Sequence, residues 1–82
     1  MFINNNEITF ENRTSSTKYG FKHITTLTVN GAKYRASAQY YNRTWEPYPY
    51  YTTMCKAASK VDDPAIRADL LQNLRSGCYY PM

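Results

Sequence analysis

Apolar and polar residues alternate most regularly on either side of an Asn-Gly pair at residues 30 and 31. Asn-Gly is the preferred centre of a type I′ turn, because both central residues of that turn need positive φ. A one-residue slip would exchange the two faces of the strands, so the apolar pattern specifies the register. Folding about the pair sets Val29 opposite Ala32, Leu27 opposite Tyr34, Thr25 opposite Ala36, His23 opposite Ala38 and Phe21 opposite Tyr40.

The other face of this predicted β-hairpin is polar and basic. Its first strand carries Lys22, Ile24, Thr26 and Thr28, and its second carries Lys33, Arg35, Ser37, Gln39 and Tyr41. We expect the apolar face to be covered by helices, because small residues such as Ala36 and Ala38 leave room for a close neighbour. The basic face should then be open and positive.

A shorter alternation precedes the hairpin. Residues 7–11 predict a strand that buries Ile8 and Phe10. Residues 12–20 are rich in Ser, Thr and Asn and end in Gly, a composition that indicates a loop.

Two amphipathic helices are predicted after the hairpin. The first is indicated by the apolar positions Tyr50, Tyr51, Met54, Cys55, Ala58 and Val61, which follow a helical period. Pro47 or Pro49 can occupy its first turn, where a missing N–H costs nothing. The second begins at Asp62-Asp63-Pro64, where an Asp caps free N–H groups and Pro64 takes the first helical position, and it ends at Gly77. Its buried stripe should contain Ile66, Leu70, Leu71 and Leu74.

The order β-β-β-α-α predicts an α+β fold, a three-stranded antiparallel sheet with two helices packed on one face. Residues 1–82 form one small domain on this interpretation. So small a domain has a thin core, and a deep pocket is hard to build in it. The size of the chain therefore favours a binding module over an enzyme.

The chain has a formal net charge of +4, and its charges are unevenly distributed. No acidic residue falls between Glu11 and Glu46, whereas that interval holds Arg13, Lys18, Lys22, Lys33, Arg35 and Arg43. Such asymmetry fits a footprint for nucleic acid or an acidic protein. It equally fits a solvated face that keeps a small protein in solution.

Residue types for catalysis are scarce. His23 is the single histidine and points to the covered face, which favours a packed histidine over a general base. One His and the separated Cys55 and Cys78 do not make a zinc site, and no glycine-rich phosphate loop is present. We therefore expect no catalytic residue, no metal, no cofactor and no enzymatic activity.

The start of the chain lacks a signal-peptide pattern, and no apolar stretch is long enough to span a membrane. These features lead us to expect a cytoplasmic protein with reduced cysteines. A disulfide between Cys55 and Cys78 would need an oxidising compartment.

Residues 40–51 are unusually aromatic, with six Tyr or Trp among twelve residues. Tyr, Trp and Arg dominate interface hot spots and also stack on unpaired bases. Trp45 and Tyr40 equally suit the end of a small core. The candidate partner-binding residues are Tyr41, Arg43, Trp45, Tyr48, Lys22, Lys33 and Arg35.

Residues 40–46, Tyr-Tyr-Asn-Arg-Thr-Trp-Glu, follow the Asn-Gly hairpin and precede a Tyr-rich helix. This pattern, over residues 30–55, resembles small accessory proteins encoded by bacteriophages and other mobile elements. The resemblance implies a class in which some members block host defences, such as CRISPR effectors, by binding. Many such inhibitors are acidic DNA mimics, and this basic chain departs from that pattern.

The expected function is thus a non-catalytic inhibitor or accessory protein, acting on a host protein or ribonucleoprotein in the cytoplasm of a bacterial host. The alternative is a nucleic-acid-binding module that uses the basic sheet face for DNA or RNA. A homodimer formed through an exposed edge strand or through the Tyr-rich tail is a further possibility.

Overall fold

The computed structural model describes residues 2–3, 5–41 and 50–76. Antiparallel strands lie side by side in the order β1-β2-β3-β4, and two helices follow them in the chain. The elements are β1 (Phe2–Ile3), β2 (Asn6–Thr17), β3 (Gly20–Val29), β4 (Ala32–Tyr41), α1 (Tyr51–Ser59) and α2 (Pro64–Arg75). The α+β class, the antiparallel sheet and the two helices are confirmed, and the two-residue strand β1 extends the predicted sheet.

The hairpin about Asn30 and Gly31 has the predicted register, with Val29 opposite Ala32 and Phe21 opposite Tyr40. The φ angles of Asn30 and Gly31 are 49° and 89°, the positive values that a type I′ turn needs. Asn30 also joins the turn to β2. Its Oδ1 accepts from the N–H of Glu7 at 2.9 Å, and its own N–H donates to the Glu7 carbonyl at 2.9 Å.

Strand β2 is much longer than predicted. It runs through most of the segment assigned to a loop, residues 12–20, and a two-residue turn at Lys18 and Tyr19 joins it to β3. Ser, Thr and Asn favour loops because their side chains compete for backbone hydrogen bonds. Here β3 offers a complete ladder, from Ile8 opposite Val29 to Thr17 opposite Gly20, and the ladder overrides that local preference. The predicted loop is wrong.

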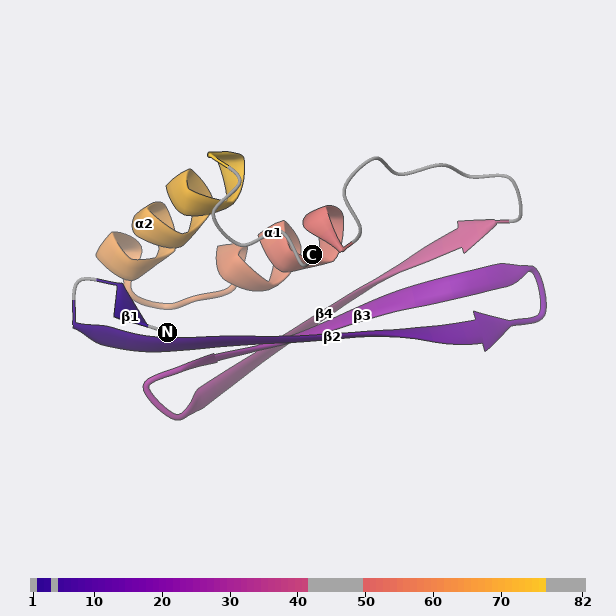
Figure 1. Ribbon diagram of the computed structural model, residues 1–82, viewed down its shortest axis with the longest axis horizontal. Coiled ribbons are helices and arrows are strands. Elements are labelled where there is room, and N and C mark those ends of the chain that lie inside the picture. Colours follow the sequence, from indigo (N-terminus) through magenta and orange to yellow (C-terminus); the bar gives the residue numbers. More distant parts are fainter. Residues whose placement is uncertain (1, 4, 42–49, 77–82) are drawn as a thin grey trace.

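Both helices lie on one face of the sheet, as predicted (Figure 1). Helix α1 lies over β3 and β4 and packs against α2. The molecule measures 40 × 23 × 20 Å, and its long axis follows the strands. At about 3.4 Å per residue, the twelve residues of β2 alone reach about 40 Å.

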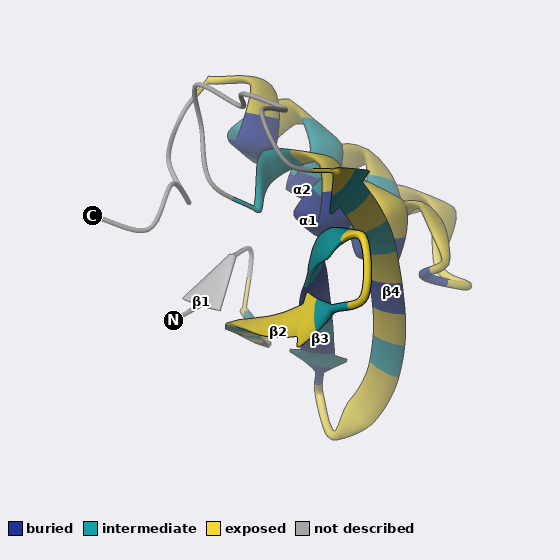
Figure 2. Cartoon of the chain, turned by 90° about the vertical axis from the view of Figure 1, so that its right-hand side faces the viewer, coloured by how far each residue is buried: buried dark blue, intermediate teal, exposed yellow. Residues whose placement is uncertain are grey.

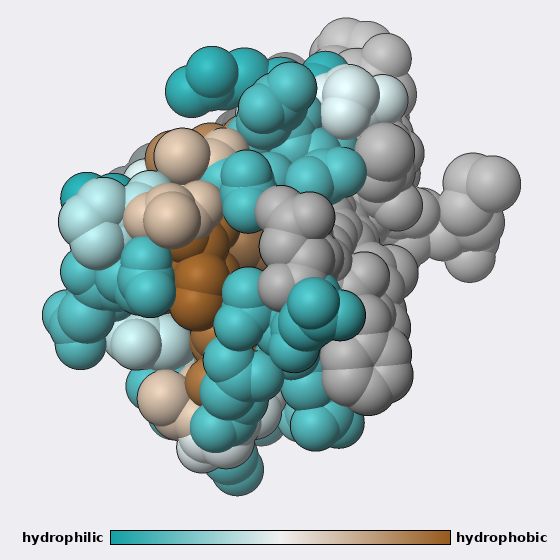
Figure 3. Space-filling view, turned by 90° about the vertical axis from the view of Figure 1, so that its left-hand side faces the viewer, coloured by the Kyte–Doolittle hydropathy of each residue, from teal (hydrophilic) through white to brown (hydrophobic). Residues whose placement is uncertain are grey.

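The core is shared by the inner face of the sheet and both helices. Along β4, residues alternate between more exposed and more buried, as a strand with one covered face requires (Figure 2). Figure 3 shows apolar residues in a strip flanked by polar ones, at the end of the molecule where β1 and α2 lie. The buried cluster comprises Ile8, Leu27, Val29, Ala36, Met54, Ala57, Ala58, Val61, Leu70 and Leu74.

Helix α2 begins where the sequence predicts. The side chain of Asp63 accepts hydrogen bonds from the N–H groups of Ala65, at 2.9 Å, and Ile66, at 3.3 Å. Leu70 and Leu74 are buried, and Ile66 and Leu71 pack against the core at its margin. Gly77, the predicted end of this helix, lies outside the described residues.

Helix α1 is shorter than predicted, and its buried face is slightly rotated. Met54 and Ala58 are buried as expected, but they are joined by Thr53 and Ala57, whereas Cys55 is only half-buried. The rotation follows from where the helix meets the sheet, because Thr53 finds a hydrogen-bonding partner in Thr25 of β3.

Candidate nucleic-acid interface

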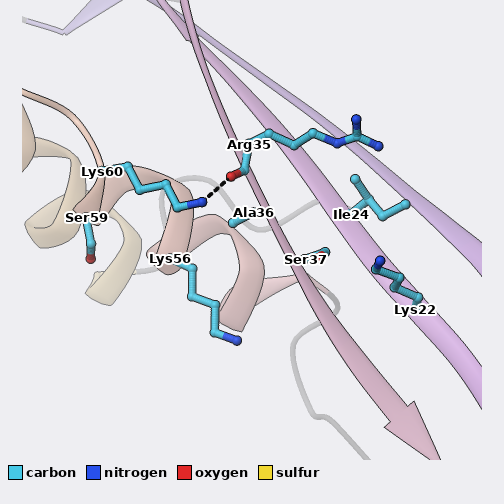
Figure 4. Close-up of a pocket in the computed structure, with 8 residues that line it drawn as sticks. All are labelled: Lys22, Ile24, Arg35, Ala36, Ser37, Lys56, Ser59 and Lys60. Carbon is cyan, nitrogen blue, oxygen red and sulfur yellow. Dashed lines mark hydrogen bonds between the residues drawn. The ribbon is translucent and has the colours of Figure 1, made fainter.

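A groove of about 740 Å³ crosses the open edge of the sheet at β4 (Figure 4). Strand β4 is the last strand of the sheet, so one side of its backbone faces away from β3. The groove is built from β3, β4 and α1, which bring together residues distant in the sequence. Its lining residues are Lys22, Ile24, Arg35, Ala36, Ser37, Lys56, Ser59 and Lys60.

Four of these lining residues are cations, and among the described residues that line the groove there is no carboxylate. Figure 4 shows Lys56 and Lys60 reaching from α1 on one side of β4, while Lys22 and Arg35 lie on the other side. Like charges gathered in one groove repel one another and create a positive potential. The arrangement suits an anion that can touch both sides of the strand.

Lys60 also occupies the strand edge itself. Its ammonium donates to the backbone carbonyl of Arg35 at 2.5 Å. A carbonyl at a sheet edge is open to an incoming strand, and a lysine at the edge is one of the devices that discourage such pairing. Lys60 therefore opposes the pairing of another β-strand with β4 at Arg35 and favours other kinds of ligand in the groove.

The outer face of the sheet is less uniformly positive than expected. Within the described residues, no helix covers it, and Lys33 and Arg35 are exposed. However, β2 adds Glu7 and Glu11 to this face together with Arg13, as its register with β3 places all three outward. The expectation of an open face is confirmed, but positive charge is concentrated on the β4 side of it, where it continues around the edge onto α1.

Two tyrosines stand out at one end of the sheet. Tyr19 is 63% exposed and Tyr41 is 61% exposed, and they are the large exposed hydrophobic residues of the described chain. Tyr19 lies in the β2–β3 turn next to Gly20, and Gly20 pairs with Tyr41. The ammonium of Lys18 lies 5.5 Å from the centroid of the Tyr19 ring.

The predicted partner-binding residues divide into three groups. Lys22 and Arg35 meet in the groove, and Tyr41 lies on the same outer face at the end of β4. Lys33 is exposed on that face, close to the Asn30-Gly31 turn, and does not line the groove. Arg43, Trp45 and Tyr48 lie outside the described residues.

Sequence reasoning missed Lys56, Lys60 and Tyr19. Lys56 lies in the last turn of α1 and Lys60 is its C-terminal cap, positions at which the helix dipole stabilises cations. Helix stability alone accounts for both lysines, so the sequence carries no local signal that they line a groove. Tyr19 was assigned to a loop, which hid its position at the same end of the sheet as Tyr41.

His23 belongs to the interior, as predicted. It is 9% exposed and its ring lies 4.4 Å from that of Tyr50, 4.8 Å from that of Tyr40 and 5.2 Å from that of Phe21, measured between centroids. This aromatic cluster lies under the N-terminal end of α1, and the hydroxyl oxygens of Tyr50 and Thr14 are hydrogen-bonded at 2.6 Å. Packing accounts for the position of His23.

Neither metal-binding nor membrane-spanning features occur in the described part of the chain. No group of three or more His, Cys, Asp or Glu residues there could hold a metal ion. No helix in residues 50–76 is long and apolar enough to cross a membrane. Cys55 is half-buried on α1, and Cys78 lies outside the described residues.

Comparisons with protein-family models, with curated proteins and with solved structures find no match to this chain. The resemblance to phage accessory proteins therefore stays an expectation drawn from residues 30–55. The groove and its charges have to be interpreted from their own chemistry.

Proposed function

We propose that this protein is a non-catalytic nucleic-acid-binding module whose phosphate-binding surface is the groove at β4. The observation that carries the proposal is the convergence of Lys22, Arg35, Lys56 and Lys60 from three elements on one groove. Phosphates neutralise such a set and release the counterions that the nucleic acid had condensed, which drives binding at moderate salt. A cytoplasmic location in a bacterial host is part of this proposal.

The form of the groove supports a chain-like anion. The cations lie on both sides of a β-strand, and Ser37 and Ser59 add hydroxyl groups along the same lining. Hydroxyls and cations are the side-chain groups that most often contact phosphate and sugar. Ile24, which is 6% exposed, forms part of the buried floor between them.

The test compares two double variants of equal charge. Lys22→Gln/Lys56→Gln removes two cations from the groove, whereas Lys33→Gln/Arg75→Gln removes two exposed cations elsewhere. We expect the groove variant to bind a labelled single-stranded oligonucleotide about tenfold more weakly at about 50 mM salt. Its plot of log K against log salt concentration should be shallower by about 1.4, since each lost phosphate contact removes about 0.7. Fluorescence anisotropy measures both quantities.

The control variant should lose much less affinity, because its charges act only through the general field of the protein. Two results would contradict the proposal. One is no binding of the wild type to single- or double-stranded DNA or RNA at about 50 mM salt. The other is an equal loss in both double variants, which would assign the effect to net charge alone.

The second candidate is the expected inhibitor of a host ribonucleoprotein, such as a CRISPR effector. The observation that favours it is that Tyr41 shares an exposed face with Lys22 and Arg35, and Tyr and Arg are common in interface hot spots. We expect a pull-down from a bacterial lysate to recover a ribonucleoprotein that a Tyr41→Ala/Arg35→Ala variant does not recover. Two outcomes would count against this candidate. One is that the wild type and the variant recover the same ribonucleoprotein, and the other is that the wild type recovers none.

A further inference from the structure

Tyr41 lies on the same edge strand as the groove, and Tyr19 lies in the β2–β3 turn at the end of the sheet where β4 also ends. Tyr41 is six residues beyond Arg35 on β4, which corresponds to about 20 Å of strand. Lys22 lies between them, because it pairs with Gln39 of β4. Along the direction of β4, the order is therefore Arg35, then Lys22 on the neighbouring strand, then the Tyr41 ring.

The end of the sheet leaves the Tyr41 side chain uncovered. Its partner across the strand pair is Gly20, which has no side chain to pack over the ring. Gln39 is held on the outer face by a hydrogen bond from its Nε2 to Thr17 Oγ1 at 2.7 Å. Tyr19, at the adjacent turn, brings a second exposed ring to the same end, with the Lys18 ammonium beside it.

We call Tyr19 and Tyr41, two large exposed aromatic residues at one end of a small domain, the tyrosine patch. Single exposed apolar residues are common and need no explanation, whereas exposed aromatic residues at one end of a domain suggest a contact surface. Proteins that bind single-stranded nucleic acid combine a positive groove that follows the backbone with aromatic side chains on which bases stack. Both components are present here, because β4 carries residues of the groove and ends at Tyr41.

We propose that the Tyr19 and Tyr41 patch stacks unpaired bases while the β4 groove holds the adjoining phosphates, so that the site selects single-stranded over double-stranded nucleic acid. This inference rests on the proposed function and narrows its ligand. In a duplex the bases are already stacked on one another and offer their faces to no side chain.

The experiment measures the binding of labelled oligothymidylate, oligouridylate and a perfect DNA hairpin duplex, each in a low-salt buffer, by fluorescence anisotropy. The proteins are the wild type, Tyr41→Ala, Tyr41→Phe, Tyr19→Ala and Lys22→Gln/Lys56→Gln. Circular dichroism and thermal melting identify any variant that has lost its fold. The DNA and RNA arms show whether the site distinguishes the sugar.

We expect the wild type to bind both single strands at least about tenfold more tightly than the duplex. Tyr41→Ala should lower single-strand affinity about tenfold with an unchanged salt slope, because stacking releases no counterions. Tyr41→Phe should bind like the wild type, since it keeps the ring, and Tyr19→Ala should weaken single-strand binding in the same direction. Lys22→Gln/Lys56→Gln should weaken all three ligands and reduce the slope.

The results that overturn this inference differ from those that overturn the proposed function. Two results would refute base stacking by the tyrosine patch and leave the basic groove intact. One is that Tyr41→Ala and Tyr19→Ala bind single strands as tightly as the wild type does. The other is that the duplex binds as tightly as a single strand. If Tyr41→Ala does not fold, Tyr19→Ala and the comparison of single strand with duplex decide the question. Failure of the wild type to bind any of the three ligands would overturn the groove and the patch together.

Discussion

A buried hydroxyl network joins the sheet to α1 at the scale of single residues. Thr25 of β3 and Thr53 of α1 are both fully buried. Thr25 Oγ1 lies 2.7 Å from Thr53 Oγ1 and 2.6 Å from Asn12 Oδ1, and Thr53 Oγ1 is within 3.1 Å of the Tyr50 carbonyl. Buried polar groups are tolerated when they bond to one another. The network therefore sets the rotation of α1 on the sheet.

We expect Thr25→Val to destabilise the protein by about 1–3 kcal/mol, because the new methyl group faces oxygens that lose their hydrogen-bonding partner in the core. Valine has nearly the shape of threonine, so the loss reports the hydroxyl rather than a cavity. Urea unfolding followed by circular dichroism measures the change as a lower midpoint at constant slope.

A matched substitution on the same strand isolates this effect. Thr28→Val changes a half-buried outer-face threonine, and surface substitutions usually stay within about 0.5 kcal/mol. A Thr25→Val protein as stable as Thr28→Val would show that the network contributes nothing to the free energy of unfolding.

At the scale of elements, the edge strand β4 depends on α1. Its Arg35 carbonyl points away from β3 and accepts from Lys60, which follows the last turn of the helix. The helix thus protects the middle of an edge that would otherwise offer backbone groups to another strand. A homodimer through this edge, one of the possibilities left open by the sequence, would have to displace Lys60.

We expect Lys60→Met to raise the association constant for self-association by about tenfold, the equivalent of about 1.4 kcal/mol. The substitution frees the Arg35 carbonyl and removes a charge that opposes strand pairing. Sedimentation velocity over a range of protein concentrations measures the change.

Lys56→Met is the control, because it makes the same chemical change one helical turn earlier, at a lysine in the groove for which no bond to the strand edge is observed. Equal self-association of the two variants would mean that lost charge, rather than the freed carbonyl, governs association of the edge.

At the scale of the whole molecule, charge and aromatic residues are separated along the sheet. Glu7 and Glu11 sit on β2 beside a single cation, Arg13, whereas four cations gather around β4 and α1. Exposed tyrosines lie at the end of the sheet that holds the β2–β3 turn and the end of β4. This distribution gives the domain one edge suited to a polyanion. Neither the net charge of +4 nor the acid-free interval in the sequence specifies that edge.

Part of the candidate site could be predicted from local patterns. Lys22 and Arg35 were placed on one face because the Asn30-Gly31 turn fixes the hairpin register, and that register is observed. Lys56 and Lys60 could not be joined to them, because no local pattern tells which strand a helix will cover. Tyr19 was missed for a related reason, since the ladder with β3 turned a loop-like segment into β2.

The sequence by itself determined the features that depend on neighbouring residues: the type I′ turn, the faces of β3 and β4, the Asp63 cap of α2 and the interior position of His23. These follow from backbone preferences and from alternation within one segment. The tertiary structure alone decided the length of β2, the rotation of α1 and the groove that crosses β4. Each of these arises from contacts between distant segments, whose free energy outweighs the local preferences that a sequence pattern records.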